Sequence, residues 1–270
     1  MIFGEAHPYG QVIESPFVLD RIHREELQSF YKEQYLGQGG ITIFISGRTE
    51  PWMLNALDEE IGGIAEAKGE DPPYKVPPAD PSAPAEHWVK KEGALQAAIR
   101  VGKPLFGRDH PDFPGMVILS TLLGGYFGSR LMMNLREDKG YTYGVGCASI
   151  ALQDSGFFAI ATEVGTQVRE AAIEEIRKEV RRLSDEPVAA EELEHVRRYM
   201  EGSFLSSADG PFAQADLFKN VHRAGLDLSY YDKLMETLHN ITPEELQGLA
   251  QKHLREEDLR TVIAGDPKEA

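Results

Sequence analysis

The chain has 270 residues, of which 41% are hydrophobic and 27% are charged, a balance typical of a folded globular protein and not of a disordered or fibrous one. Its 28 Lys and Arg residues against 44 Asp and Glu give a formal net charge of −16, which disfavours general binding to the phosphate backbone of nucleic acid. The one cysteine, Cys147, excludes an intramolecular disulfide and a cysteine-rich zinc site, and no apolar run reaches the ~20 residues of a membrane helix.

A proline-rich stretch divides the chain into a short front part and a long back part. Six of the 16 prolines fall within residues 71–85, and because proline continues neither a helix nor a central strand, this stretch predicts an extended connector. We therefore expect a linker over 71–86, with a front part over 1–70 and a back part over 87–270.

The back part alternates the signals of strands and helices. Gly140 is expected to end one helix from its C′ position, and Thr242 and Glu245 form a capping box that starts the last one, with Pro243 at N1. Hydrophobic periodicity and breakers predict, in chain order, a strand around 97–101, helices over 111–123 and 127–139, strands over 141–150 and 156–163, helices over 166–183 and 189–206, a helix over 243–254 and a strand over 260–264.

The last helix–strand unit is similar to an earlier one at a fixed offset. Residues 241–247 match residues 22–28 at five of seven positions, and without a gap 261–264 falls on 42–45, an offset of 241 − 22 = 219 residues. We interpret this as an internal duplication; chance similarity between two helix–strand units is the alternative. A duplication predicts the back portion of a two-domain protein of about 440 residues, with about 170 residues of the first copy preceding this chain. A natural protein with a vestigial half-domain is the other interpretation.

Histidines and carboxylates are plentiful, but their spacing predicts no metal site in this chain. None of the eight histidines forms an HxxEH or HExxH pair, the arrangement that places two metal-binding imidazoles on one helix face. Glu192 lies three residues before His195 without a second histidine on that face, and we interpret both as solvated helix charges.

Residues 122–143 combine a glycine-rich loop, a helix, a glycine break and a predicted strand. Small residues in the loop would let another backbone approach closely. Arg136 lies in the last turn of the predicted helix, and on the predicted strand Tyr143 shares a face with Tyr141 and Val145. A guanidinium and a phenol could then converge as two donors suited to a peptide carbonyl. In the structural alternative, the helix macrodipole favours Arg136 at that position and Tyr143 covers a sheet face.

Several short motifs in this stretch follow one another in a defined order. They are Leu-Gly-Gly, Ser-Arg-Leu, Asn-Leu-Arg-Glu-Asp-Lys-Gly and a tyrosine seven residues after the arginine, at 123–125, 129–131, 134–140 and Tyr143. In this order and spacing they resemble the signature of the pitrilysin-like (M16) zinc metallopeptidase family. The segment His7-Pro8-Tyr9-Gly10 also resembles one late in that family's first domain, so the resemblance covers most of the chain.

The resemblance implies an α+β fold with an antiparallel sheet and helices packed on it, as in LuxS-like and processing-peptidase-like metalloenzymes. The family has two homologous domains of this kind. In these terms residues 1–70 are the C-terminal remnant of the first domain, 71–86 the linker, and 87–270 a complete second domain.

The resemblance also implies roles for particular residues. The second domain supplies an Arg–Tyr pair, which here is Arg136 and Tyr143: Tyr143 would donate to the developing oxyanion, and Arg136 would anchor the peptide or the strand that carries the tyrosine. The glycine-rich loop contacts substrate in some relatives, and the corresponding residues here are Gly124, Gly125, Tyr126, Gly128 and Ser129.

The zinc-binding motif of the family is not present in this chain. Zinc is therefore expected in the missing domain or in a partner subunit, and the chain alone is expected to be inactive. The implied partners are a peptide or unfolded polypeptide substrate and a zinc-bearing M16 domain or subunit in a homo- or hetero-dimer, with no nucleic acid and no membrane span. The alternative is a non-catalytic scaffold or binding subunit. The sequence predicts a soluble protein but decides neither the compartment, cytoplasmic or periplasmic, nor the substrate.

Overall fold

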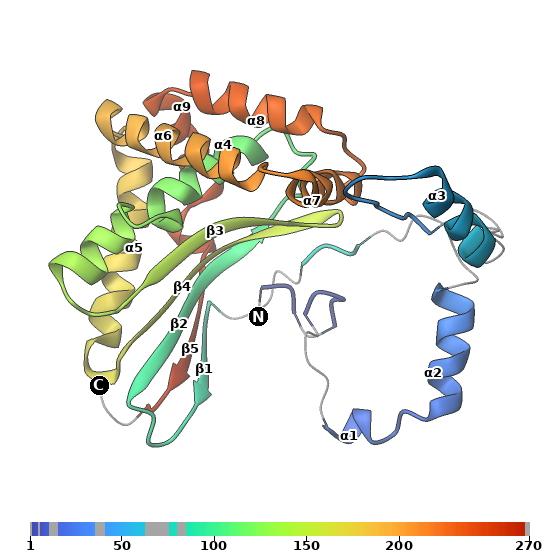
Figure 1. The fold of residues 1–270 in the computed structure, drawn as a ribbon. Helices are drawn as coiled ribbons and strands as arrows, with labels where there is room; N and C mark the ends of the chain where they lie inside the picture. Colours follow the sequence, from blue (N-terminus) through green and yellow to red (C-terminus); the bar gives the residue numbers. More distant parts are fainter. Residues whose placement is uncertain are drawn as a thin grey trace.

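The structure is a computed structural model that describes residues 2–4, 6–10, 16–35, 41–62, 76–79 and 85–267. Most of the predicted proline-rich linker lies outside these residues. Residues 85–267 form one five-stranded sheet with helices packed on one of its faces (Figure 1). This arrangement confirms the predicted α+β fold class.

The sheet has the strand order β1-β5-β2-β4-β3. Its strands are β1 (Glu86–Lys90), β2 (Gln96–Leu105), β3 (Val145–Leu152), β4 (Ser155–Gly165) and β5 (Arg260–Gly265). Neighbouring strands are antiparallel except for the pair of β1 and β5, which is parallel. Strands β2 and β4 pair along their whole length, from Gln96 opposite Gly165 to Leu105 opposite Gly156, and so form the centre of the sheet.

Alternation along the central strands separates a buried face from an open one. Ile99 on β2 and Phe158 on β4 are fully buried beneath the helices, whereas their neighbours Ala98 and Ala159 are only half-buried. The helices on the buried face are α4 (Phe113–Ser120), α5 (Arg169–Asp185), α6 (Ala190–Ser207), α7 (Pro211–His222), α8 (Ser229–Asn240) and α9 (Pro243–His253). Among the described residues, none of the helices is both long and apolar enough to cross a membrane.

Two segments near the sheet are wound as π-helix. The first, Thr121–Gly125, continues α4, and the second is Met132–Asp138. The second segment ends with wide hydrogen bonds, from the Lys139 N–H to the Asn134 carbonyl at 3.0 Å and from the Tyr141 N–H to the Leu135 carbonyl at 2.8 Å. Gly140 has φ +66°, which confirms its predicted place just after the helix, since the left-handed conformation favours glycine.

The capping box predicted at residue 242 is confirmed. The Glu245 N–H donates to Thr242 Oγ1 at 3.2 Å, and the Thr242 N–H donates to Glu245 Oε2 at 2.9 Å. At the same offset of 219 residues, α2 (Arg24–Phe30) begins in the same way: the His23 N–H donates to Glu26 Oε2 at 2.8 Å.

The strand expected in the first copy of the repeated unit does not form. Residues 41–46 belong to no strand, because a strand requires ladder hydrogen bonds to a neighbour and none of the described strands lies beside them. Phe44 instead contacts α7, with ring centroids 5.8 Å from Phe218 and 5.5 Å from His222. The helices α1 (Pro16–Leu19), α2 and α3 (Pro51–Leu57) stand away from the sheet in Figure 1.

An ion cluster joins the start of α4 to the end of α9. Asp112 Oδ2 lies 2.7 Å from Lys252 Nζ and 2.7 Å from His253 Nε2. The hydrogen bond from Lys252 holds the pKa of Asp112 below its ordinary value, with His253 contributing and burial opposing.

Because the folded pKa of Asp112 lies below its unfolded value of about 3.9, this carboxylate stabilises the fold above that pH and loses its contribution as the pH falls through the folded pKa. We expect part of the loss in the free energy of unfolding between pH 5 and pH 3 to come from this group, roughly 0.5–1 kcal/mol for a partly exposed pair. Urea unfolding at both pH values measures the loss. Asp112→Asn should reduce it, and an unchanged loss in that variant would contradict the assignment.

Candidate functional site

Arg136 and Tyr143 lie together at one end of the sheet. Arg136 is in the π-helical segment 132–138, and Tyr143 is in the bend between Gly140 and β3. The Cζ atom of Arg136 lies 4.8 Å from the centroid of the Tyr143 ring and 4.7 Å from that of Phe127. The guanidinium therefore contacts two aromatic rings, a geometry in which cation–π attraction holds it in place.

The predicted position of Tyr143 on a strand is wrong. Strand β3 pairs with β4 only from Val145 onward, so Tyr143 shares no strand face with Tyr141 and Val145. The reason is the side chain of Thr142: its Oγ1 donates to the Glu163 carbonyl at 2.7 Å and accepts from the Gly144 N–H at 3.1 Å. These bonds replace ladder hydrogen bonds and bend the chain before the strand begins.

The bend turns the Tyr143 ring outward. Its side chain is 88% exposed, so it does not cover the sheet face, and its hydroxyl makes no hydrogen bond to any residue that the structure describes. Arg136 is also linked to Glu137, with Nε 3.3 Å from Oε1. The arrangement thus presents a free phenol beside a positioned guanidinium, which is suited to donating hydrogen bonds to an oxygen of an incoming group.

Phe127 forms a cluster with Arg136 and Tyr143 that was not predicted from the sequence. It is exposed and lies in the glycine-rich loop, nine residues before Arg136 in the chain. A tertiary contact between a loop and the following helix has no signal in local periodicity.

Some residues of the glycine-rich loop are exposed and others are buried. Gly125 and Gly128 are exposed and Tyr126 is half-buried, whereas Gly124 and Ser129 are buried. A Cβ on Gly124 would lie 2.5 Å from Cβ of Cys147 on β3, so this glycine permits close approach of the chain's own strand. Burial raises the pKa of the Cys147 thiol well above its ordinary value, and the thiol therefore remains protonated and unreactive.

A partly buried ion pair fixes the loop to helix α6. Arg130 Nε and Nη2 donate to the two carboxylate oxygens of Glu192 at 2.7 and 2.9 Å, and the Arg130 side chain is only 8% exposed. The interpretation of Glu192 as a solvated helix charge is therefore wrong, because its partner comes from a segment 62 residues away in sequence. Asn134 makes a second link, from Nδ2 to Glu175 and Glu179 on α5 at 2.9 and 2.8 Å.

A cavity of about 310 Å³ opens beside Tyr143. Arg100 on its wall donates to the Thr162 carbonyl at 3.1 Å and lies 3.7 Å from Glu163. The outer edge of β3 is not open to an added strand, because its Val145 and Ser149 N–H groups point to Met132 Sδ and Ser120 Oγ at 3.4 and 3.1 Å. A polypeptide at this end would therefore be held by side chains and not by pairing with β3.

The described residues do not fit a zinc site. Within the ranges that the structure describes, no group of three or more His, Cys, Asp or Glu side chains is placed to hold a metal ion. Structural and catalytic zinc sites take at least three such ligands.

Comparison with known protein families gives a match over most of the chain. The model described as "Peptidase M16 inactive domain" matches residues 21–200. Among curated proteins, the chain is 23% identical over 240 residues to "Uncharacterized zinc protease YmxG" of Bacillus subtilis, covering 87% of this chain and 56% of that protein. It is also 23% identical over 220 residues to "Non-peptidase homolog YmxG" of Helicobacter pylori, covering 80% of this chain and 49% of that protein.

Solved structures show the same fold. A peptidase M16 inactive domain from Pseudomonas fluorescens superposes with a TM-score of 0.81 at 22% identity, covering 98% of this chain and 63% of that one. A protease from Helicobacter pylori gives a TM-score of 0.77 at 18% identity, covering 92% of this chain and 60% of that one. The chain spans about half the length of the curated relatives it matches.

Proposed function

The chain belongs to the family of peptidase M16 inactive domains, and on this premise we propose that it is the substrate-binding, transition-state-supporting half of a zinc endopeptidase. The observation that carries the proposal is the contact of Arg136 with Tyr143, at 4.8 Å from the guanidinium carbon to the ring centroid. Both side chains lie at one surface, and the phenol is free to bind a group from outside this chain.

In this proposal Tyr143 donates its hydroxyl proton in a hydrogen bond to the oxygen of the scissile carbonyl. That oxygen gains negative charge as water adds, so a donor placed there stabilises the transition state more than the ground state. Arg136 positions the tyrosine ring and supplies positive charge close to the same oxygen. The exposed residues Gly125, Tyr126 and Gly128 would contact the bound polypeptide, and the buried Gly124 and Ser129 would support the loop from beneath.

Zinc would activate the water, and it would be bound by another domain or subunit. Curated relatives about twice the length of the matched region bear the name zinc protease, which is consistent with a metal site on a part that this chain does not include. A peptide or unfolded polypeptide would then lie between the two halves. The halves could be two domains of one chain or the two subunits of a homo- or heterodimer. This chain alone would hydrolyse nothing.

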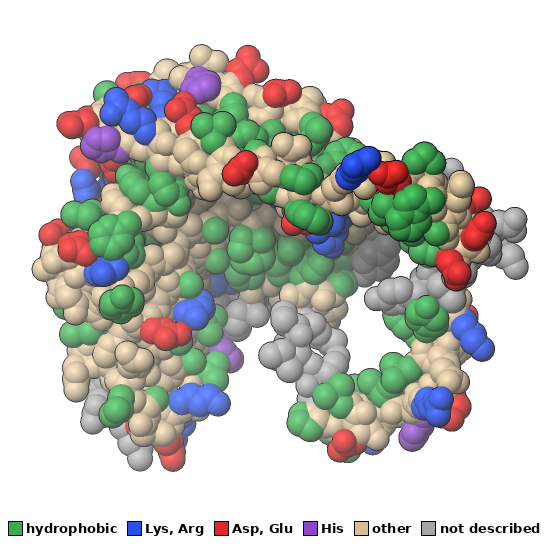
Figure 2. All heavy atoms as spheres, viewed as in Figure 1, with side chains coloured by type: hydrophobic (Ala, Val, Ile, Leu, Met, Phe, Trp, Pro, Cys, Tyr) green, Lys and Arg blue, Asp and Glu red, His purple; other side chains and the backbone are tan. Residues whose placement is uncertain are grey.

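Exposed apolar side chains in the front part, residues 1–70, favour a preceding domain of the same fold. Leu27 on α2 is 57% exposed, whereas Leu246, its equivalent at the offset of 219 residues, is fully buried on α9. Figure 2 shows hydrophobic side chains at the surface of the front helices, and Trp52 and Leu54 on α3 are among the exposed ones. We infer that residues 1–70 complete a preceding domain homologous to 87–270, which would cover these side chains.

A second function is favoured by one comparison. The relative from Helicobacter pylori is named a non-peptidase homolog. The fold could accordingly act as a scaffold or binding subunit, in which the exposed cluster at Tyr143 binds a polypeptide without cleaving it.

Zinc content distinguishes the two functions without an activity assay. We expect the natural assembly that contains this chain to hold about one zinc ion per copy of the chain, as a single catalytic site requires, when measured by atomic absorption after dialysis. The isolated chain should hold none. An assembly free of zinc would support the scaffold, and stoichiometric zinc on the isolated chain would contradict the proposed division between two halves.

A further inference from the structure

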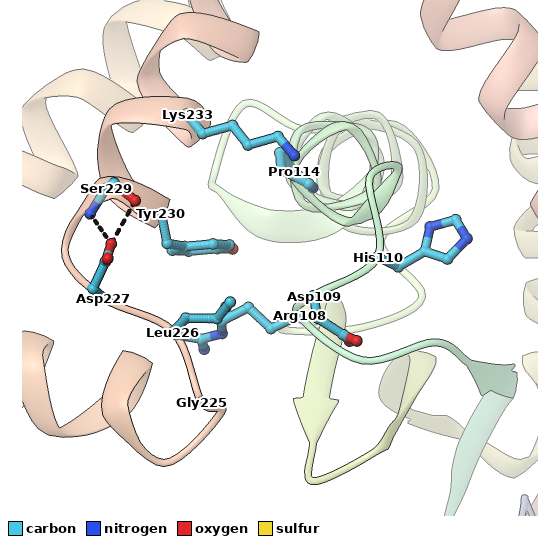
Figure 3. Close-up of a pocket in the computed structure, with 10 residues that line it drawn as sticks. All are labelled: Arg108, Asp109, His110, Pro114, Gly225, Leu226, Asp227, Ser229, Tyr230 and Lys233. Atoms are coloured by element: carbon cyan, nitrogen blue, oxygen red, sulfur yellow. Dashed lines mark hydrogen bonds between the residues drawn. The ribbon is translucent and has the colours of Figure 1, made fainter.

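Charged side chains gather in a cavity away from the candidate site, but their mixture indicates no ligand. The cavity measures about 370 Å³ and opens between the loop after β2 and the start of α8 (Figure 3). Two cations and two carboxylates line it, namely Arg108, Lys233, Asp109 and Asp227. A second charged cluster, on α5, is bound to the π-helical segment Met132–Asp138 that carries Arg136. This second cluster can therefore act on the candidate site.

The side chain of Asn134 joins the π-helical segment to α5. Its Nδ2 donates one hydrogen bond to Glu175 Oε2 at 2.9 Å and another to Glu179 Oε1 at 2.8 Å. The two glutamates lie one helical turn apart, and their side chains are 17% and 4% exposed, so the amide enters a space that is largely closed to water. An amide nitrogen has two hydrogens to donate, and both are used here.

Charge fixes the orientation of this amide. The hydrogen bond from Asn134 lowers the pKa of Glu175, with burial opposing and Lys139 adding to the effect, so this carboxylate is ionised near neutral pH and can only accept. Glu179 also accepts from Arg182 at 2.9 Å. Turning the amide over would place its oxygen against two carboxylates, and the side chain is therefore held in one orientation.

This orientation leaves one polar atom unpaired. Asn134 Oδ1 is buried and accepts no hydrogen bond from any residue that the structure describes. A buried acceptor without a donor lowers the stability of the fold, and an apolar side chain at the same position would avoid that loss. The unpaired oxygen thus favours a role for Asn134 in position over a purely stabilising one.

Arg136 lies between two points at which the segment is tied to Glu175. Asn134 precedes it by two residues, and Lys139, whose Nζ lies 3.5 Å from Glu175 Oε1, follows it by three. The Lys139 N–H also donates to the Asn134 carbonyl at 3.0 Å and closes the wide turn between them. π-Helical turns are rare and are frequent at functional sites. Because both ends of this turn are held, the direction in which Arg136 leaves the backbone is set, toward the two aromatic rings that it contacts.

We propose that Asn134 is a positioning residue, which couples α5 to the candidate site by holding the π-helical turn in the register that directs Arg136 toward Tyr143. The fully buried Leu135 anchors the same segment to the core, but an apolar contact is non-directional and does not fix that register. Asn134 touches no substrate, because both of its donors are used on α5. The proposal rests on the proposed function in that Arg136 acts there on the bound polypeptide.

Nuclear magnetic resonance of the isolated chain tests the positioning without an activity assay. The guanidinium carbon of Arg136 lies over the rings of Phe127 and Tyr143, and protons over the face of an aromatic ring are shielded, so its Hε and Hδ signals should lie upfield of those of a free arginine. Asn134→Leu keeps a side chain of similar size and removes both hydrogen bonds, and we expect these signals to return toward the free values. Asn240→Ala removes an exposed amide at the end of α8 and should leave them unchanged.

A variant on α5 provides a second test. Glu175→Ala lies 41 residues from Asn134 in sequence, yet it removes the acceptor of one amide hydrogen and the partner of Lys139, so the Arg136 signals should move in the same direction. Tyr143→Phe keeps the ring and should leave them in place. Unchanged Arg136 signals in folded Asn134→Leu and Glu175→Ala would overturn the proposal and reduce Asn134 to a structural residue.

Kinetics of the complete zinc-bearing assembly separate this proposal from the proposed function. Asn134→Leu should lower kcat about tenfold with little change in KM, as a misplaced group does. Combined with Arg136→Ala, it should lose no more than Arg136→Ala alone, because nothing is left to position; an additive loss would overturn the proposal. Displaced Arg136 signals together with full turnover would support positioning by Asn134 and contradict the role proposed for Arg136.

Discussion

Replacing Tyr143 by phenylalanine should lower kcat of the complete zinc-bearing assembly by about 10²–10³-fold, with little change in KM. The expected loss is that of one oxyanion donor, ~2.7–4 kcal/mol. An interaction made only in the transition state lowers kcat and kcat/KM together and leaves ground-state binding intact. Steady-state hydrolysis of a quenched fluorescent peptide by the full-length or paired enzyme measures both constants.

A neighbouring tyrosine provides the matched control. Tyr141 is half-buried and packs against the core, so Tyr141→Phe removes a hydroxyl two residues away without touching the proposed oxyanion position. We expect kcat of that variant to stay close to that of the unmodified enzyme. Full turnover by Tyr143→Phe would show that its hydroxyl has no part in catalysis, whatever the contact with Arg136 does for the fold.

A large loss of stability is expected from Glu192→Ala. The free energy of unfolding should fall by about 3 kcal/mol, toward the low end of the 3–5 kcal/mol found when one partner of a buried ion pair is removed. The low end applies because the Glu192 side chain is 27% exposed, whereas that of Arg130 is 8% exposed and would remain as an uncompensated buried charge. Urea denaturation followed by circular dichroism measures the change.

Two further variants distinguish the contribution of the ion pair to stability from that of helix α6. Glu191→Ala removes an exposed carboxylate from the adjacent position of α6 and should change stability by less than about 0.5 kcal/mol. The double variant Arg130→Met with Glu192→Leu should recover much of the loss, since an apolar pair needs no solvation. If Glu192→Ala costs no more than Glu191→Ala, the ion pair does not anchor the glycine-rich loop.

Features determined by neighbours in sequence could be predicted. The capping box at Thr242 and the helix end at Gly140 depend on side chains and φ angles within a few residues, and both are confirmed. The helices that begin at 169 and 190 follow apolar stripes with a period of 3.6 residues, and these stripes form the buried faces of α5 and α6.

Features that depend on distant contacts were missed or wrong. The sequence pattern placed no element over 207–240, where α7 and α8 form. It also placed a strand at 42–45 that has no neighbouring strand to pair with. Strands β1 and β5 pair in parallel, with Glu86 opposite Thr261, about 175 residues further along the chain. No local sequence rule predicts a pairing between such distant segments.

The candidate site divides in the same way. The spacing of Arg136 and Tyr143 across Gly140 left open whether the two side chains converge, and the family resemblance paired them; the structure places them in contact. The bend formed by Thr142, the stacking of Phe127 on Arg136 and the ion pair of Arg130 with Glu192 all come from tertiary packing. The sequence could therefore nominate the two side chains, but not the surface on which they are presented.

Reconstitution tests the central claim most directly. The purified chain is titrated into a zinc-bearing M16 domain or subunit that carries the HxxEH motif, and hydrolysis of an unfolded polypeptide is followed. We predict that neither part cleaves alone, that activity rises with added chain to a stoichiometric end point, and that Arg136→Ala chain does not restore it. Full activity of the zinc-bearing part without this chain, or an inactive mixture of two bound parts, would contradict the account.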